Sequence, residues 1–284
     1  SRLYFKSKPS LRIGITGPPG AGKSSLIESL GLLCIDKGYS VAVLSIDPSS
    51  AISKGSILGD KTRMASLGLH EKAFIRPSPS GDYLGGIAQN TRESIFLCES
   101  AGYDYIFVET AGIGQTEYQV STMTDLTLLV LIPGAGDELQ GIKKGIMEWA
   151  DIMVLNKADE KKDPRVVQSF RDLLAASHLF SEKTPGWNVK IMMTSALSGA
   201  GIPALFEQII EFQMHVHRQG QFTQRRERQM INYFHDLVNR KFWDKMEQQS
   251  GLKAAKQSLE ERIKSREISP EEAAELALSF IFAT

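Results

Sequence analysis

Six short apolar runs rich in valine and isoleucine recur along the chain, and none alternates cleanly between apolar and polar positions. A strand that is half exposed would alternate, whereas a strand buried on both faces of a parallel sheet reads as a continuous apolar run. The pattern therefore predicts buried strands at residues 11–16, 41–46, 105–109, 126–132, 152–155 and 189–194.

Apolar residues at helical spacing fill the segments between these strands. The predicted helices cover residues 23–37, 84–101, 139–150, 165–178 and 202–217. Alternating strands and helices predict an α/β fold with a doubly wound, mostly parallel sheet, which binds its ligand at the carboxyl ends of the strands. The stretch 48–86 is rich in Ser, Gly and Pro and has little periodicity, so we predict a long functional loop there.

Beyond residue 217 the pattern changes to helical stripes without a strand-like run. We therefore predict an α/β domain over residues 1–217 and a helical C-terminal arm over residues 218–284. Ser269 is predicted to cap the last helix, because Pro270 and Glu272 follow it at first-turn positions. The apolar stripe of the arm fits packing on the first domain, dimerisation or partner docking equally well.

Composition and charge narrow the class of protein only a little. The chain has 284 residues, of which 42% are hydrophobic and 23% charged, and its formal net charge is zero. Such values are ordinary for a globular protein and give no reason to expect a nucleic acid or an anionic membrane as partner. Cys34 and Cys98 fall in helical patterns and are predicted to be buried thiols. Residues 1–10 lack the apolar core of a signal peptide, so we expect a cytoplasmic location in a bacterium and the mitochondrial matrix in a eukaryote.

The first candidate site follows the first predicted strand and opens the first predicted helix. Its sequence fits G-x-x-x-x-G-K-[ST], the P-loop, whose backbone N–H groups surround phosphates. Lys23 is predicted to reach the β- and γ-phosphates, and Ser24 to offer its hydroxyl to Mg²⁺. The residues of this loop are Gly17, Pro18, Pro19, Gly20, Ala21, Gly22, Lys23, Ser24 and Ser25.

The second candidate site is Asn156-Lys157-Ala158-Asp159, which follows the strand at 152–155. The Asp159 carboxylate can accept hydrogen bonds from the N1–H and N2–H of guanine, whereas adenine would leave it unpaired. Asn156 and Lys157 would brace the base and the loop. Ser195-Ala196-Leu197 follows the last strand, where a backbone N–H can contact the guanine oxygen. Together the two sites predict a protein that binds GTP or GDP with Mg²⁺.

Three carboxylates are candidates for the Mg²⁺ shell. Glu109 ends the strand at 105–109, and Gly112 follows it at the spacing with which GTPases contact the γ-phosphate. Asp47 ends the strand at 41–46 and is predicted beside the phosphates, because a parallel β-α-β unit leads to it from the P-loop. Asp60 lies in the long loop. The β-α-β unit that leads from the P-loop to Asp47 resembles that of the branch containing signal-recognition-particle GTPases and Min-type ATPases.

The residues for hydrolysis itself are incomplete. Ile113 stands where Ras-type enzymes place a water-orienting glutamine, and Gln115 is two positions on. We therefore predict slow intrinsic turnover, on the order of 10⁻⁴ to 10⁻² s⁻¹, until a partner docks. The Gly-rich segment that contains Lys143 is either an ordinary β–α connection or a switch that responds to that partner.

Longer motifs carry a resemblance to a family. They are GPPGAGKSS from Gly17, IDPSS from Ile46, GSILGDKTRM from Gly55, FIRPSPS from Phe74, ETAGIGQTE from Glu109, GDELQGIKKG from Gly136 and NKAD from Asn156. In these stretches the chain resembles the methylmalonyl-CoA mutase-associated GTPases, the family of the methylmalonic aciduria type A protein, whose bacterial members were once described as arginine/ornithine transport kinases.

The resemblance implies a GTP-dependent chaperone that gates adenosylcobalamin loading and protects or reactivates a B12-dependent acyl-CoA mutase. It places the Mg²⁺ and switch carboxylates on Asp47, Asp60 and Glu109. It places a third switch on residues 137–143, with Lys143 as the catalytic lysine. It also implies a homodimer through the arm, and contact with adenosylcobalamin only through the client. A cobalamin adenosyltransferase is a further candidate partner.

Three other functions share some of these sequence features. A GTPase for another metallocentre would carry Cys or His clusters, but His215 and His217 are two apart on a helix and share no face. A kinase would share the P-loop but not the guanine motif. An adaptor that only binds GTP stays open. The basic run Arg225, Arg226 and Arg228 is predicted as a solvated helix face, with docking to an acidic partner as the alternative.

Overall fold

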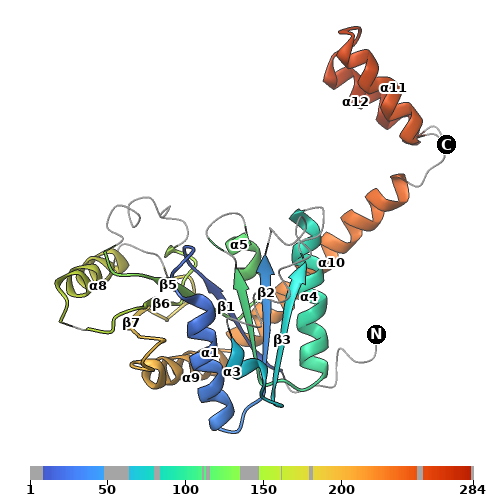
Figure 1. Ribbon diagram of the computed structural model, residues 1–284. Helices are drawn as coiled ribbons and strands as arrows, with labels where there is room; N and C mark the ends of the chain where they lie inside the picture. The colour runs from blue at the N-terminus through green and yellow to red at the C-terminus, as the bar shows by residue number, and fades with distance from the viewer. Residues whose placement is uncertain are drawn as a thin grey trace. The chain divides into compact units, whose positions relative to one another are not determined.

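The computed structural model describes residues 9–47, 64–79, 84–110, 112, 116–134, 147–160, 162–178, 182–247 and 252–282. These residues include a parallel sheet of seven strands in the order β3-β2-β4-β1-β5-β6-β7 (Figure 1). The strands are β1 Leu11–Thr16, β2 Val41–Asp47, β3 Ala73–Pro79, β4 Tyr105–Thr110, β5 Leu126–Leu131, β6 Ile152–Leu155 and β7 Lys190–Met193.

Helices connect these strands and continue beyond the last of them. They are α1 Lys23–Asp36, α3 Ala65–Gly68, α4 Leu84–Ser100, α5 Thr116–Ser121, α8 Pro164–Ser177, α9 Ile202–Arg218, α10 Gln221–Glu247, α11 Leu252–Lys264 and α12 Pro270–Phe282. The predicted fold class is confirmed: an α/β doubly wound parallel sheet followed by a helical arm. The predicted helix at 139–150 lies mostly outside the described residues.

One strand was missed. β3 lies inside the stretch 48–86 that was predicted as a loop, and it pairs with β2 in the register Val41↔Ala73. Its second half, Arg76-Pro77-Ser78-Pro79, contains two prolines and has no apolar periodicity. Proline cannot donate to a ladder but is tolerated on an edge strand, and β3 is an edge of the described sheet. The short α3 and α5 were also not predicted.

Side chains from alternate positions along the strands fill the two faces of the sheet. On one face, α1 and α9 pack on residues such as Ile13 and Val154. On the other, α4 covers the region of Leu44 and Val108, and α8 covers that of Met153. Both cysteines are buried, as predicted, and burial raises the pKa of Cys34 to about 12 and that of Cys98 to about 11.

Three aspartates each stand one residue before a strand and bind the backbone of one residue twice, within the neighbouring strand or, for Asp104, one residue before it. The Asp N–H donates to a carbonyl oxygen at 3.1, 2.8 and 3.0 Å, and Oδ2 of the same Asp accepts the N–H of that residue at 3.0, 2.8 and 2.8 Å. We call these pairs the aspartate clamps: Asp104 with Ser40, Asp125 with Arg12, and Asp151 with Thr127. Each clamp precedes the first aligned residues of its strand pair and therefore supports the register of that pair.

A buried ionic network surrounds the clamps of β5 and β6. Asp151 accepts Lys183 Nζ at 2.6 Å and Thr184 Oγ1 at 2.6 Å. Burial and the Arg225 guanidinium lower the pKa of Lys183, while Asp151 opposes them. Arg225 donates to the carbonyl oxygen of Asp125 and, at 2.8 Å, to Thr184 Oγ1. The prediction of a solvated basic face is therefore wrong for Arg225, because its guanidinium completes this network.

The chain divides into two compact units, Ser1–Arg225 and Arg226–Thr284. The predicted boundary at residue 217 stays a prediction. In the second unit, Ser269 Oγ accepts the N–H of Glu272 at 3.1 Å, which confirms the predicted cap of α12. Among the described residues, no helix combines the length and the apolar character needed to cross a membrane.

Candidate nucleotide-binding site

The P-loop connects the carboxyl end of β1 to α1, and two of its glycines have no room for a side chain. A Cβ on Gly17, which has φ 147°, would lie 2.1 Å from the carbonyl oxygen of Val130. A Cβ on Gly22, which has φ 82° and caps α1, would lie 2.6 Å from Asn156 Nδ2. The loop thus has the backbone that the motif predicts, and it leads directly into the N-terminus of α1, where a helix can bind an anion.

Lys23 lies inside this loop. Its side chain is 94% buried, and Nζ donates to the carbonyl oxygens of Gly17 at 2.8 Å and Pro18 at 3.0 Å. These bonds fix a positive charge at the centre of the loop. The position suits the predicted contact with the β- and γ-phosphates, because charge-assisted hydrogen bonds to phosphate oxygens are strong.

The structure brings together two of the predicted Mg²⁺ residues. Ser24 Oγ donates to Glu109 Oε1 at 2.8 Å, and Ser45, which faces Glu109 across the β2–β4 pair, lies 3.5 Å from Oε2. A hydroxyl and a carboxylate at this separation supply the hard oxygen donors that Mg²⁺ prefers, so the residues fit the metal. Asp47 ends β2, next to β4 rather than β1, and its side chain is not described. Asp60, Gln115 and Lys143 lie outside the described residues.

Asn156 connects the phosphate side of the site to the guanine side. It is almost fully buried, and Nδ2 donates to the carbonyl oxygens of Ala21 at 2.9 Å and Gly22 at 3.4 Å. Its Oδ1 accepts from Thr194 Oγ1 at 3.2 Å and from the N–H of Ala196 at 3.1 Å. One side chain, referred to below as the Asn156 bridge, therefore joins the P-loop to the loop that begins at residue 194.

Asp159 is exposed, and its Oδ1 accepts a hydrogen bond from Ser195 Oγ. Within the described part of the chain, no group binds Oδ2, which can accept from a ligand. The N–H of Ser195 donates to Ala200 and that of Ala196 to Asn156. Of these three predicted residues, Leu197 alone has an N–H without an acceptor among the described residues, and its side chain is 94% exposed. The geometry thus gives Ser195 and Ala196 supporting contacts and leaves the Leu197 N–H free for a base oxygen.

Lys157 of the guanine motif has a left-handed backbone, with φ 58°. Its Cε would lie 3.9 Å from a Cβ on Gly22, so its side chain runs along the P-loop. This position agrees with the predicted role of bracing the loop, because the aliphatic stem of a lysine can cover the backbone beneath it.

Sequence reasoning missed the polar residues that hold these groups. Thr16 is the last residue of β1, Ser45 lies near the end of β2, and Thr194 directly follows β7. Each is a polar residue at the carboxyl end of an apolar strand, where side chains turn toward the ligand edge of a parallel sheet. This position at the end of an apolar strand is the sequence signal that could have identified these three residues.

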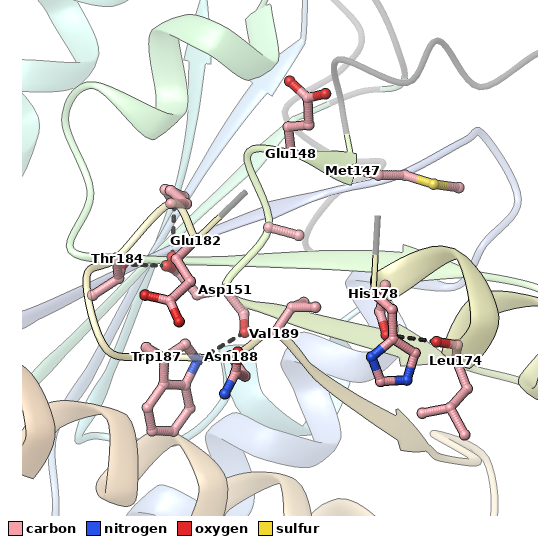
Figure 2. Close-up of a pocket in the computed structure, with 13 residues that line it drawn as sticks. Met147, Glu148, Asp151, Leu174, His178, Glu182, Thr184, Trp187, Asn188 and Val189 are labelled. Atoms are coloured by element: carbon pink, nitrogen blue, oxygen red, sulfur yellow. Dashed lines mark hydrogen bonds and ion pairs between the residues drawn. The ribbon is translucent and has the colours of Figure 1, made fainter. Parts of the chain in front are cut away.

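A pocket of about 360 Å³ lies elsewhere, between the end of α8 and the residues that precede β6 and β7 (Figure 2). Asp151, Lys183 and Trp187 line it together with Glu148 and His178, and the Trp187 indole N–H donates to the carbonyl oxygen of Asp151 at 3.0 Å. It contains no residue of the P-loop or the guanine motif. It lies at the amino end of β6, whereas Asn156 follows the carboxyl end, so this pocket is not the nucleotide site.

Comparison with known proteins settles the family. The family model described as methylmalonyl Co-A mutase-associated GTPase MeaB matches residues 1–251. The chain belongs to the MeaB family. GTPase ArgK of Escherichia coli is 45% identical over 224 residues, which cover 79% of this chain and 68% of that protein. The mitochondrial methylmalonic aciduria type A homolog of Mus musculus is 38% identical over 277 residues, 97% of this chain and 67% of that protein.

Solved structures share the fold of this chain. The crystal structure of LAO/AO transport system kinase superposes with a TM-score of 0.74 at 32% identity, covering 99% of this chain and 84% of that one. HypB from Helicobacter pylori in complex with nickel gives a TM-score of 0.51 at 16% identity, over 75% of this chain and 89% of that one, and shows the shared fold alone. The predicted enzyme class is confirmed: this member of the MeaB family is a P-loop GTPase.

Proposed function

We propose that this MeaB-family GTPase gates the loading of adenosylcobalamin into a B12-dependent acyl-CoA mutase and protects or reactivates that enzyme. The observation that carries the proposal is the family match over residues 1–251, whose description names association with methylmalonyl-CoA mutase. The mouse relative, a methylmalonic aciduria type A homolog, supports it.

The residues of the nucleotide site divide the work of hydrolysis. The P-loop N–H groups and Lys23 bind and orient the phosphates, while Asp159 and the Leu197 N–H select guanine. Ser24 and Glu109 would hold Mg²⁺, and Asp47 and Asp60 would complete its shell. When bound, the metal neutralises charge that develops on the β- and γ-phosphate oxygens. Gly112 contacts the γ-phosphate, and Gln115 is a candidate to orient the attacking water.

Slow hydrolysis without a partner is part of the proposal. Ile113 replaces the usual water-orienting glutamine, and Lys143 reaches the nucleotide only when the client docks. The arm forms a homodimer, and a cobalamin adenosyltransferase is a second partner. The protein works in the cytoplasm of a bacterium or in the mitochondrial matrix. An adaptor with negligible turnover is the alternative.

The test compares GTP hydrolysis with and without an adenosylcobalamin-dependent acyl-CoA mutase, for the wild type, Lys143→Ala and Lys144→Ala. Lys144→Ala is the matched control, since this substitution removes the same charge one position away. We expect the mutase to accelerate the wild type and Lys144→Ala, but not Lys143→Ala. Equal stimulation of all three would refute the role of Lys143. No stimulation of the wild type, with single-turnover hydrolysis still absent in excess mutase, would favour the adaptor.

A further inference from the structure

Two buried threonines lie side by side at the carboxyl ends of the central strands. Thr16 ends β1 and Thr110 ends β4, and these strands are adjacent, with Ile15 aligned to Glu109. The side chain of Thr16 is 2% exposed and that of Thr110 is fully buried. Their hydroxyl oxygens are 3.2 Å apart, and Thr110 Oγ1 is also 3.2 Å from the carbonyl oxygen of Gly112.

The number of protons fixes the direction of these hydrogen bonds. A hydroxyl carries one proton and two lone pairs, whereas a carbonyl oxygen can only accept. Thr110 Oγ1 therefore donates its proton to the Gly112 carbonyl oxygen, and one of its lone pairs accepts the proton of Thr16. A relay runs from Thr16 through Thr110 to the Gly112 carbonyl, and all three groups are satisfied, as buried polar groups require.

The other side of Gly112 meets the P-loop. A Cβ built on Gly112 would lie 3.3 Å from Pro19 Cγ, closer than most real contacts of that kind. Gly112 is therefore held by its carbonyl to the end of β4 and limited by the ring of Pro19. Thr16 directly precedes Gly17, the first residue of the P-loop. The relay therefore fixes the position of Gly112 relative to the start of the P-loop.

We propose that Thr110 is a positioning residue for GTP hydrolysis, which uses Thr16 to hold Gly112 against the P-loop at the place of the γ-phosphate. This inference rests on the γ-phosphate contact of Gly112 in the proposed function. GDP has no γ-phosphate, so its affinity does not depend on the relay. Loss of the Thr110 hydroxyl should therefore reduce turnover and the preference for GTP over GDP, but not GDP binding.

The experiment uses the full chain with Thr110→Val, Thr110→Ser and Thr16→Val. The control is Thr124→Val, a buried threonine that directly precedes the β5 clamp and donates to the carbonyl oxygen of Val120 at 2.9 Å. Single-turnover GTP hydrolysis and the Kd values for GDP and a non-hydrolysable GTP analogue are measured with Mg²⁺. For Thr110→Val we expect about a tenfold loss in rate and in GTP preference, equal to about 1.4 kcal/mol, with the GDP Kd within about twofold of the wild type.

Two further results support the inference. Thr110→Ser keeps the hydroxyl and should recover most of the rate. Thr16→Val leaves the bond from Thr110 to Gly112 intact, so it should lose only about threefold to fivefold. If Thr110→Val does not fold, Thr16→Val still tests the relay, because wild-type values in that variant contradict it.

Other outcomes overturn the inference. Wild-type rates in Thr110→Val would show that the hydroxyl does not act on Gly112. An equal loss of GDP and GTP affinity would show a merely structural role, and the same loss in Thr124→Val would show a general effect of buried threonines. The proposed function fails separately: the wild type would hydrolyse GTP with no response to any mutase, while the comparison of Thr110 variants would keep its meaning.

Discussion

The Asn156 bridge can be broken on one side only. Asn156→Asp keeps the size and shape of the side chain but replaces Nδ2, a donor, with an oxygen. The new oxygen would face the carbonyl oxygens of Ala21 at 2.9 Å and Gly22 at 3.4 Å, where attraction becomes repulsion. The contacts of Oδ1 with Thr194 and Ala196 remain, since a carboxylate oxygen accepts as well as an amide oxygen.

The magnitude follows from these distances. Each buried group left without its partner costs about 1–3 kcal/mol, and the Ala21 carbonyl should carry most of the loss because its bond is the shorter. We expect the free energy of unfolding to fall by about 2–4 kcal/mol. Since the same bonds hold the P-loop against the guanine loop, GDP affinity should fall by about tenfold to a hundredfold, or 1.4–2.8 kcal/mol.

Urea unfolding and titration with a fluorescent GDP measure the two quantities. Asn188→Asp is the matched control, because it makes the same chemical change away from the nucleotide site. Asn188 is exposed and lines the pocket of Figure 2. Equal stability of the two variants, with unchanged GDP affinity in Asn156→Asp, would refute the reasoning. It would mean that the P-loop keeps its position without the bridge.

Two other predictions concern the base and the pH. Asp159→Asn should lose about a hundredfold or more in GTP affinity and gain affinity for xanthosine triphosphate. The carbonyl at position 2 of xanthine can accept a hydrogen bond from the new amide. Competition binding measures the nucleotide preference, and an unchanged preference would contradict this prediction. Burial raises the pKa of Cys34 from 9.0 to about 12, so the folded chain keeps a proton that the unfolded chain releases. The free energy of unfolding should therefore fall as the pH rises from 9 to 12, and less steeply in Cys34→Ala; parallel urea midpoints for the two proteins across this range would count against it.

The fold was largely predictable because most of its strands are buried on both faces. Such strands are continuous apolar runs, and six of them were found within a residue or two of their ends. β3 escaped because an edge strand needs neither apolar faces nor a full set of donors, so Arg76-Pro77-Ser78-Pro79 resembles a loop. The short α5 escaped because six residues are too few to show helical periodicity.

The candidate site was predictable in its parts but not in its contacts. The P-loop and the guanine motif are local patterns, and each appears where a strand ends. The bonds from Ser24 to Glu109 and from Asn156 to Ala21 join residues 85 and 135 positions apart, and only the strand order brings them together. Arg225 was misjudged for the same reason, since a run of arginines says nothing about distant carbonyl oxygens. The roles of Asp60 and Lys143 stay predictions.

The aspartate clamps lie at the amino ends of the strands, opposite the nucleotide site, yet they influence how that site is aligned. Asp104 stands five residues before Glu109, about 16 Å along the strand. A strand that slipped without exchanging its faces would move by two residues, about 7 Å. That shift would separate Glu109 from Ser24, which are now 2.8 Å apart. The alignment of the residues that bind phosphate and metal thus depends on carboxylates that do not contact the nucleotide. Substituting such an aspartate would therefore affect the nucleotide site from a distance.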